Sequence, residues 1–225
     1  MTDWLHSNPI AHRGLHRGKS VPENSLAAFE AAANAGYPIE LDTRIPRTGP
    51  PVVFHDQTLD RLTGANGTIS NADYSELAGL RLYSTDQNIP SLPEVLDLVD
   101  GKVPILIELK TEDDTARLEA EVCNALHRYS GDFAVQSFES SSVEWFKINA
   151  PHFARGLVGE TMADLSRNKM DACDPNFLAC EHTGLPESKQ EKTLLAWTVR
   201  SYAEAITAKK VAENIIFEDY FPEIA

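Results

Sequence analysis

Short apolar segments and longer amphipathic segments alternate along the whole chain of 225 residues. The clearest apolar segment, 103–110, shows little apolar–polar alternation until its end, as expected for a parallel strand covered on both faces. The clearest amphipathic segment, 113–129, places Leu118, Val122 and Leu126 at helical spacing. Strands alternating with helices predict a parallel sheet with its helices outside.

About eight such units fit into a chain of this length, so we expect a compact (β/α)8 TIM barrel. The alternative is a doubly wound open sheet. No low-complexity linker divides the chain, which predicts a single domain over residues 1–225. We also expect a helix capped by Asn24 or Ser25, a short helix at 161–168 and a weak one at 186–192.

The chain is acidic, with 20 Lys and Arg against 34 Asp and Glu and a formal net charge of −14. It lacks the basic field that nucleic acids or anionic membranes require of a partner. There is no signal peptide pattern and no apolar run of about 18 residues, so we expect no stable membrane insertion. Cys123, Cys173 and Cys180 suggest neither a disulfide framework nor a zinc motif. A cytoplasmic setting is therefore expected, while nothing in the sequence indicates an oligomeric state.

Glu40 and Asp42 alternate with Ile39 and Leu41 in a predicted strand. Side chains along a strand point to opposite faces in turn, so both carboxylates share one face. A doubly acidic face is unfavourable unless it meets water or a cation. Two interpretations follow, an acid/base pair or part of a metal site.

Other predicted strands are also apolar in their body and polar at their carboxyl end. The segment 50–56 is a further short strand of this kind. In a barrel these ends meet at one mouth, where the active sites of this fold lie. The period of two, with Arg13 added as the neighbour at the end of the first strand, groups His12, Arg13, Glu40, Asp42, His55, Glu108 and Lys110.

This set of side chains indicates phosphoryl or phosphodiester chemistry. Three neighbouring carboxylates cannot all stay ionised without a cation, and oxygen-only ligands favour Mg²⁺ or Ca²⁺. The two histidines are free for proton transfer near neutral pH. Arg13 and Lys110 are fixed positive charges suited to phosphate oxygens. Each feature alone fits a solvated strand end or an internal ion pair, so the inference depends on their coincidence at one mouth.

Several short motifs occur in a characteristic order. They are Ala11-His12-Arg13-Gly14, Pro22-Glu23-Asn24-Ser25, Glu40-Leu41-Asp42, Val53-Phe54-His55-Asp56, Ile107-Glu108-Leu109-Lys110 and, more loosely, Ala196-Trp197-Thr198-Val199 and Ile216-Phe217-Glu218-Asp219. Their order and spacing resemble the glycerophosphodiester phosphodiesterase family over nearly the whole chain. Two departures are that Glu218 stands where the family more commonly has Thr, and that 56–107 is too short for the inserted small domain of some members.

The resemblance implies a barrel that hydrolyses glycerophosphodiesters to sn-glycerol 3-phosphate and an alcohol with a divalent metal. Carried over by position, the metal ligands are Glu40, Asp42 and Glu108, the acid/base pair is His12 and His55, the phosphate contacts are Arg13 and Lys110, and Trp197 lines the glycerol side. The nucleophile is water or the glycerol 2-hydroxyl. The alternatives are a lysophospholipase D-type phosphodiesterase and a non-catalytic barrel that binds a phosphate ligand.

A basic cluster, formed by His12, Arg13, His16, Arg17 and Lys19, interrupts the acidic chain after the first predicted strand. On a loop above the mouth, it would steer an anionic substrate into the site. The alternative is an exposed loop with incidental charge.

Overall fold

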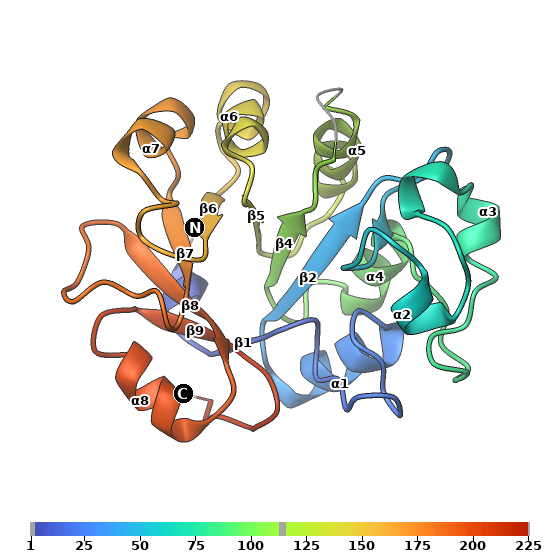
Figure 1. The fold of residues 1–225 in the computed structure, drawn as a ribbon, viewed down its shortest axis with the longest axis horizontal. Helices are drawn as coiled ribbons and strands as arrows, with labels where there is room; N and C mark the ends of the chain where they lie inside the picture. Colours follow the sequence, from blue (N-terminus) through green and yellow to red (C-terminus); the bar gives the residue numbers. More distant parts are fainter. Residues whose placement is uncertain (1–2, 113–115, 225) are drawn as a thin grey trace.

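A closed barrel of parallel strands forms the centre of the computed structural model, which describes residues 3–112 and 116–224 (Figure 1). The barrel strands are β1 (Ile10–Ala11), β2 (Ile39–Arg44), β4 (Ile105–Leu109), β5 (Phe133–Ser137), β6 (Arg155–Gly159), β7 (Phe177–Glu181), β8 (Thr193–Val199) and β9 (Asn214–Phe217). The strand β1 pairs with both β9 and β2, which closes the ring. The predicted (β/α)8 barrel is confirmed, and the open-sheet alternative is wrong because an open sheet would leave β1 and β2 unpaired.

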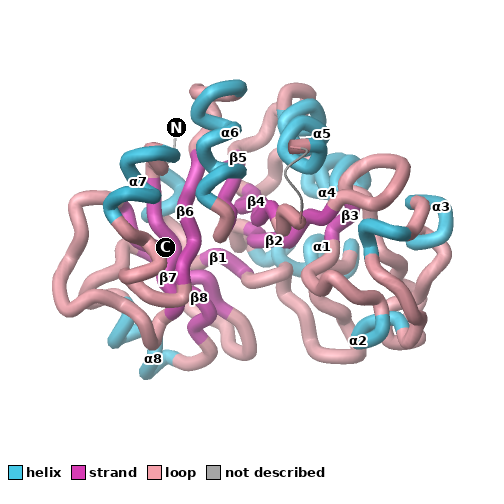
Figure 2. The backbone as a smooth tube through the Cα atoms, turned by 45° about the horizontal axis from the view of Figure 1, so that its top comes forward, coloured by secondary structure: helices cyan, strands magenta, loops and turns pink. Residues whose placement is uncertain are grey.

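The helices surround the barrel, as the two views in Figures 1 and 2 show. They are α1 (Leu26–Ala35), α4 (Leu92–Val99), α5 (Arg117–Leu126), α6 (Ser140–Asn149), α7 (Arg167–Cys173) and α8 (Tyr202–Ala208). Local sequence sets their ends: the Ser25 hydroxyl accepts the Ala28 N–H at 3.2 Å, and Gly36 ends α1 at φ 81°, a left-handed conformation that glycine adopts without strain. No helix of the described residues is long and apolar enough to cross a membrane.

The apolar core has two layers separated by the barrel wall. On β4, Ile105 and Ile107 belong to the outer layer, which packs against the helices, while Leu106 belongs to the inner layer. A short 3-10 helix, η1 (Asp3–His6), adds Trp4 and Leu5 to this inner layer. Alternation along the strand therefore directs Glu108, two residues after Leu106, into the barrel where the interior becomes polar.

Between β2 and α4 the chain leaves the barrel for an excursion, residues 52–90. It contains β3 (Val52–Val53), α2 (Asp60–Thr63), the 3-10 helix η2 (Ile69–Asn71) and α3 (Tyr74–Leu77). β3 pairs antiparallel with β2, so the expectation that 50–56 is another parallel strand of the barrel is wrong. The excursion packs its own cluster of buried apolar side chains, Val52, Phe54, Leu59, Leu62, Ile69, Leu77, Leu82 and Ile89.

Two expected helices differ from the structure. At 161–168 the Asp164 carboxylate accepts the Thr161 N–H at 2.9 Å, and this turn delays the helix until Arg167. Residues 183–192 contain no helix but turns and bends, in keeping with Gly184 and Pro186. The start of the helix expected at 113–129 falls partly outside the described residues, and α5 itself begins at Arg117.

Candidate active site

A cavity of about 290 Å³ opens at the carboxyl ends of the barrel strands. Its lining includes every site residue singled out from the sequence: His12, Arg13, Glu40, Asp42, His55, Glu108, Lys110 and Trp197. The structure thus brings these side chains together from five strands or strand-ending loops.

The first motif places His12 and Arg13 by a sharp turn at the end of β1. Arg13 has φ 53° and Gly14 has φ 78°. A Cβ atom on Gly14 would lie 2.8 Å from the backbone of Ala28 in α1, so only glycine allows this close approach of loop and helix. The turn directs the Arg13 backbone N–H at Glu40, whose Oε2 accepts it at 3.0 Å.

Glu40, Asp42 and Glu108 form an acidic trio at the bottom of the cavity. Asp42 on β2 lies in register with Glu108 on β4, and all three side chains are buried. One carboxylate oxygen from each lies within 4.8 Å of the others. Three oxygen donors at this spacing fit a hard divalent cation such as Mg²⁺ or Ca²⁺.

The three carboxylates differ in charge compensation. Burial, with Asp42 and Glu108 nearby, raises the pKa of Glu40 well above its ordinary value. Burial would also raise the pKa of Asp42, but the charges of Lys110 and Arg13 outweigh it and hold that pKa far below its usual range. Lys110 Nζ lies 3.3 Å from Asp42 Oδ1 and also contacts Glu108, and Arg13 Nε lies 3.1 Å from Asp42 Oδ2. Glu40 is therefore the carboxylate that most needs a further cation.

Asn24 orients Asp42 from outside the trio. Its amide donates to Asp42 Oδ2 at 2.8 Å, and its carbonyl oxygen accepts the Asp42 N–H at 3.3 Å. Sequence reasoning treated Asn24 as one of two possible helix caps, and the structure gives that role to Ser25. The sequence feature that could have indicated this role is the motif Pro22-Glu23-Asn24-Ser25, which provides both the helix cap and a residue that orients Asp42.

Both histidines line the cavity with Nδ1 bound to a carboxylate. His12 Nδ1 lies 2.5 Å from Glu218 Oε2, and His55 Nδ1 lies 2.8 Å from Asp56 Oδ1. Burial lowers the pKa of both imidazoles below the ordinary 6.5, which favours their neutral forms. Sequence reasoning noticed Glu218 only as a departure from the family pattern and missed its contact with His12.

Comparison with known proteins agrees with this geometry. A sequence model of the glycerophosphoryl diester phosphodiesterase family matches residues 12–221. The chain belongs to this family of phosphoric diester hydrolases. The Bacillus subtilis protein YhdW, named as a glycerophosphodiester phosphodiesterase, is 32% identical over 94% of this chain and 93% of its own length. A glycerophosphodiester phosphodiesterase of Caldanaerobacter subterraneus is 32% identical over 66% of this chain and 65% of its own.

Solved structures support the family's fold. A phosphodiesterase from Oleispira antarctica, determined with the product sn-glycerol 3-phosphate, superposes with a TM-score of 0.85 at 24% identity, over 95% of this chain and 93% of the other. At that identity the likeness concerns the barrel itself.

In this member of the phosphodiesterase family, a polar network links the two histidine sites. Glu23 accepts from Arg13 at 2.6 Å and from Arg61 at 2.7 and 2.8 Å. Arg61 also donates to Asp56 at 2.5 and 2.9 Å, and these bonds, with His55, lower the pKa of Asp56 to about 2 against the effect of burial. The network joins the excursion, which carries His55, to the loop that carries Arg13.

The apolar side of the cavity comes from Trp197 and Phe138, whose rings meet edge to face at 5.6 Å between centroids. Lys110 Nζ lies 5.5 Å from the centre of the Phe138 ring. Gln136 Nε2 donates to Glu108 Oε2 at 3.4 Å. Phe138 and Gln136 are additions to the site; Gln136 lies in β5 and Phe138 directly follows that strand.

The basic cluster divides into two parts. Arg13 contacts the trio and His16 lies 3.4 Å from Glu218, whereas Arg17 and Lys19 are exposed on the loop. The contribution of Arg17 and Lys19 to substrate steering stays a prediction.

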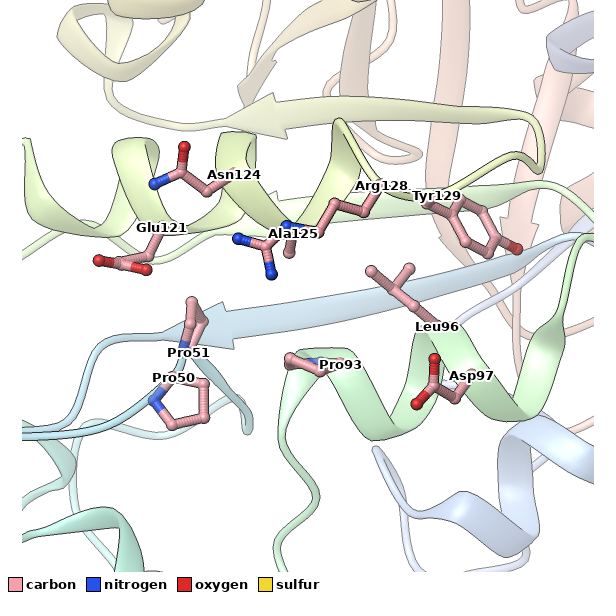
Figure 3. Close-up of a pocket in the computed structure, with 10 residues that line it drawn as sticks. All are labelled: Pro50, Pro51, Pro93, Leu96, Asp97, Glu121, Asn124, Ala125, Arg128 and Tyr129. Atoms are coloured by element: carbon pink, nitrogen blue, oxygen red, sulfur yellow. The ribbon is translucent and has the colours of Figure 1, made fainter.

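A second hollow, of about 300 Å³, lies on the outside of the barrel between α4 and α5 (Figure 3). Pro93 and Leu96 on α4 face Glu121 and Ala125 on α5 across it. It contains none of the predicted site residues, and it gathers no set of side chains with evident chemistry.

Proposed function

We propose that the protein hydrolyses glycerophosphodiesters to sn-glycerol 3-phosphate and an alcohol. The observation that carries this proposal is the meeting of three carboxylates, two fixed cations and two histidines in one cavity. The size of the cavity, about 290 Å³, suits a small polar substrate. The two bacterial relatives, which are named for this activity, point to the same reaction.

Glu40, Asp42 and Glu108 would hold a divalent metal, Mg²⁺ or Ca²⁺. Their donor chemistry and the uncompensated burial of Glu40 fit such an ion. A bound ion supplies Lewis-acid stabilisation of charge on the phosphoryl oxygens.

Arg13 and Lys110 orient the phosphate. Burial alone would lower the pKa of each side chain, but the neighbouring carboxylates raise both pKa values above their ordinary range. Both side chains therefore carry a positive charge near neutral pH. Their fixed positions beside the trio, in the wall of the cavity, favour the charged phosphodiester over a neutral ester.

His12 and His55 transfer protons. One imidazole accepts the proton of the nucleophile hydroxyl, whether water or the glycerol 2-hydroxyl, as the new P–O bond forms. The other, protonated, donates to the leaving alkoxide oxygen as the ester P–O bond breaks. Trp197 would bound the glycerol side of the substrate by its apolar face.

The test is release of sn-glycerol 3-phosphate from a panel of glycerophosphodiesters, each assayed with Mg²⁺ and Ca²⁺. We expect turnover that EDTA abolishes and that either ion restores. Binding of a phosphate ligand without turnover would favour the non-catalytic barrel instead, and choline release from lysophosphatidylcholine alone would favour a lysophospholipase D.

Further expectations accompany this function. We expect the protein to act as a single domain, in the cytoplasm, on a small molecule, and without nucleic acid or membrane insertion. The net charge of −14 supports the expectation that nucleic acid and anionic membranes are not partners.

A further inference from the structure

Glu218 follows directly after β9 and joins His12, His16 and Arg200. Its Oε2 lies 2.5 Å from His12 Nδ1 and 3.4 Å from His16 Nε2, and its Oε1 accepts from Arg200 Nε at 2.7 Å. Its side chain is 13% exposed and those of His12 and His16 are 14% and 13% exposed, so the two histidine contacts lie largely out of water. The proposed reaction gives Glu218 no role of its own.

Charge and hydrogen-bonding capacity together fix the state of His12. Burial would raise the pKa of Glu218, but hydrogen bonds from His12 and His16 outweigh it and lower that pKa, so the side chain is a carboxylate. A carboxylate only accepts hydrogen bonds, so His12 must carry its proton on Nδ1. Nε2, which makes no hydrogen bond to any described residue, is then left with its lone pair on the cavity side.

We propose that Glu218 is a positioning residue that fixes the tautomer and ring orientation of His12, with Arg200 anchoring the carboxylate. The inference rests on the proposed function and deepens it. Glu218 need not touch the substrate, because it acts through the ring whose far nitrogen faces the cavity. It makes the neutral His12 a ready proton acceptor at Nε2 and stabilises the imidazolium that forms when the proton arrives.

The His55 side of the site has the same connectivity. There Asp56 accepts from His55 Nδ1, and Arg61 Nε donates to Asp56 at 2.5 Å. Asp56 is the next residue along the chain, whereas Glu218 comes from the opposite end of the barrel sequence. Each histidine thus has a carboxylate on Nδ1 and an arginine on that carboxylate, although the partners of His12 and those of His55 come from unrelated parts of the chain. Incidental surface ion pairs would not be expected to repeat this arrangement.

A metal site is the competing explanation, because ligand atoms of His12, His16 and Glu218 lie within 4.8 Å of one another. The Arg200 guanidinium on the same carboxylate opposes a second cation there. The direct bond between His12 and Glu218 also occupies the atoms that would bind the metal.

The test compares Glu218→Gln, Glu218→Ala and Glu218→Asp in the full-length protein, on a glycerophosphodiester that the wild type turns over. Loss of the carboxylate is expected to lower kcat about 10- to 100-fold with KM nearly unchanged. Glu218→Asp should recover part of the loss. Glu204→Gln is the matched control, since that carboxylate accepts the Arg200 backbone N–H at 2.6 Å without contacting His12, and it should leave kcat unchanged.

A double mutant separates positioning from a general effect on the fold. In a His12→Ala background, Glu218→Gln should cause no further loss. An equal loss in both backgrounds would mean that Glu218 acts independently of His12 and would overturn the proposal.

Nitrogen-15 NMR of histidine-labelled protein reads the tautomer without turnover, with His12 assigned by its absence in His12→Ala. We expect protonated Nδ1 in the wild type and a mixture of tautomers in Glu218→Ala. An unchanged tautomer, or stoichiometric Zn²⁺ binding that Glu218→Gln abolishes, overturns the proposal. If no glycerophosphodiester is turned over, the proposed function fails, while the NMR result still decides the position of the proton.

Discussion

Neighbouring carboxylates of the acidic trio have unlike surroundings. Asp42 has Lys110, Arg13 and Asn24 around it, while Glu40 has the Arg13 backbone N–H. The period of two in Ile39-Glu40-Leu41-Asp42 predicted that both acids share a face. It could not predict which acid obtains the cations, because those arrive from β1 and β4 and depend on the closed barrel.

Glu40→Gln should make the metal-free protein more stable and prevent its stabilisation by metal. The wild-type carboxyl has a pKa in the folded protein above the ordinary 4.5. The folded state therefore binds this proton more tightly than the unfolded state, so the contribution of Glu40 to the stability of the metal-free protein is lost as pH rises from about 4.5 through its folded-state pKa. In Glu40→Gln the neutral amide cannot ionise, so the folded metal-free protein no longer carries a buried, ionised carboxylate at this position. The melting temperature in EDTA at neutral pH should rise in the variant, whereas added Mg²⁺ or Ca²⁺ should raise it only in the wild type.

The exposed Glu121 on α5 offers the control, since Glu121→Gln should change neither melting temperature nor metal response. A Glu40→Gln protein that still gains stability from the metal would show that Glu40 is not a ligand.

His12→Ala and His55→Ala should each lower kcat about 10²- to 10⁴-fold, because each removes a proton-transfer group from the cavity. The exposed His152 provides the comparison, and His152→Ala should turn over normally. Near-normal kcat in both cavity variants would disprove the acid/base assignment.

At the scale of elements, the loop before α1 does two separate jobs with adjacent residues. Ser25 caps the helix, and Asn24, at φ 55°, turns its side chain to Asp42. Sequence patterns recognise the cap readily. The second role depends on the left-handed turn, which the sequence does not distinguish from an ordinary helix start.

Asn24→Ala and Ser25→Ala should therefore separate metal binding from stability. Asn24→Ala removes both hydrogen bonds to Asp42 and is expected to cost about 1–3 kcal/mol and to weaken metal affinity. Ser25→Ala removes the cap, costs about 1 kcal/mol and should leave metal affinity unchanged. Denaturant unfolding in EDTA and calorimetric metal titration measure the two effects. Equal metal affinities in the two variants would contradict the role of Asn24.

The errors of prediction concern elements whose partners are not local. The segment 50–56 has the composition of a barrel strand, but β2 already pairs with β4 from Ile39 to Thr43 and with β1 at Ile39. β3 pairs with the carboxyl end of β2, at Thr43 and Arg44, and runs antiparallel to it. Apolar runs such as β4 were predictable because burial on both faces leaves a pattern in one segment alone.

Four basic residues lie in or beside the mouth of an acidic barrel. Arg13 and Lys110 lie in the cavity, and Arg17 and Lys19 lie on the exposed loop beyond β1. The net charge of −14 repels an anionic substrate over most of the surface. The loop would give such a substrate a favourable approach.

Arg17→Glu combined with Lys19→Glu should lower kcat/KM at low ionic strength and leave kcat nearly unchanged. The difference from the wild type should shrink as salt rises, because the Debye length falls to about 8 Å at 0.15 M. Lys209→Glu with Lys210→Glu makes the same change in charge at the far end of α8, away from the mouth, and serves as control. Equal kcat/KM at low salt for the two double variants would rule out steering.

The excursion between β2 and α4 divides the two cavity histidines between two packing units. His12 extends from the barrel wall, whereas His55 and its partners Asp56 and Arg61 belong to a segment with its own apolar cluster. A small cluster of this kind opens at lower free energy than a closed barrel. On heating, the excursion would then unfold before the barrel. The protein would lose activity at a temperature below the melting temperature of the barrel.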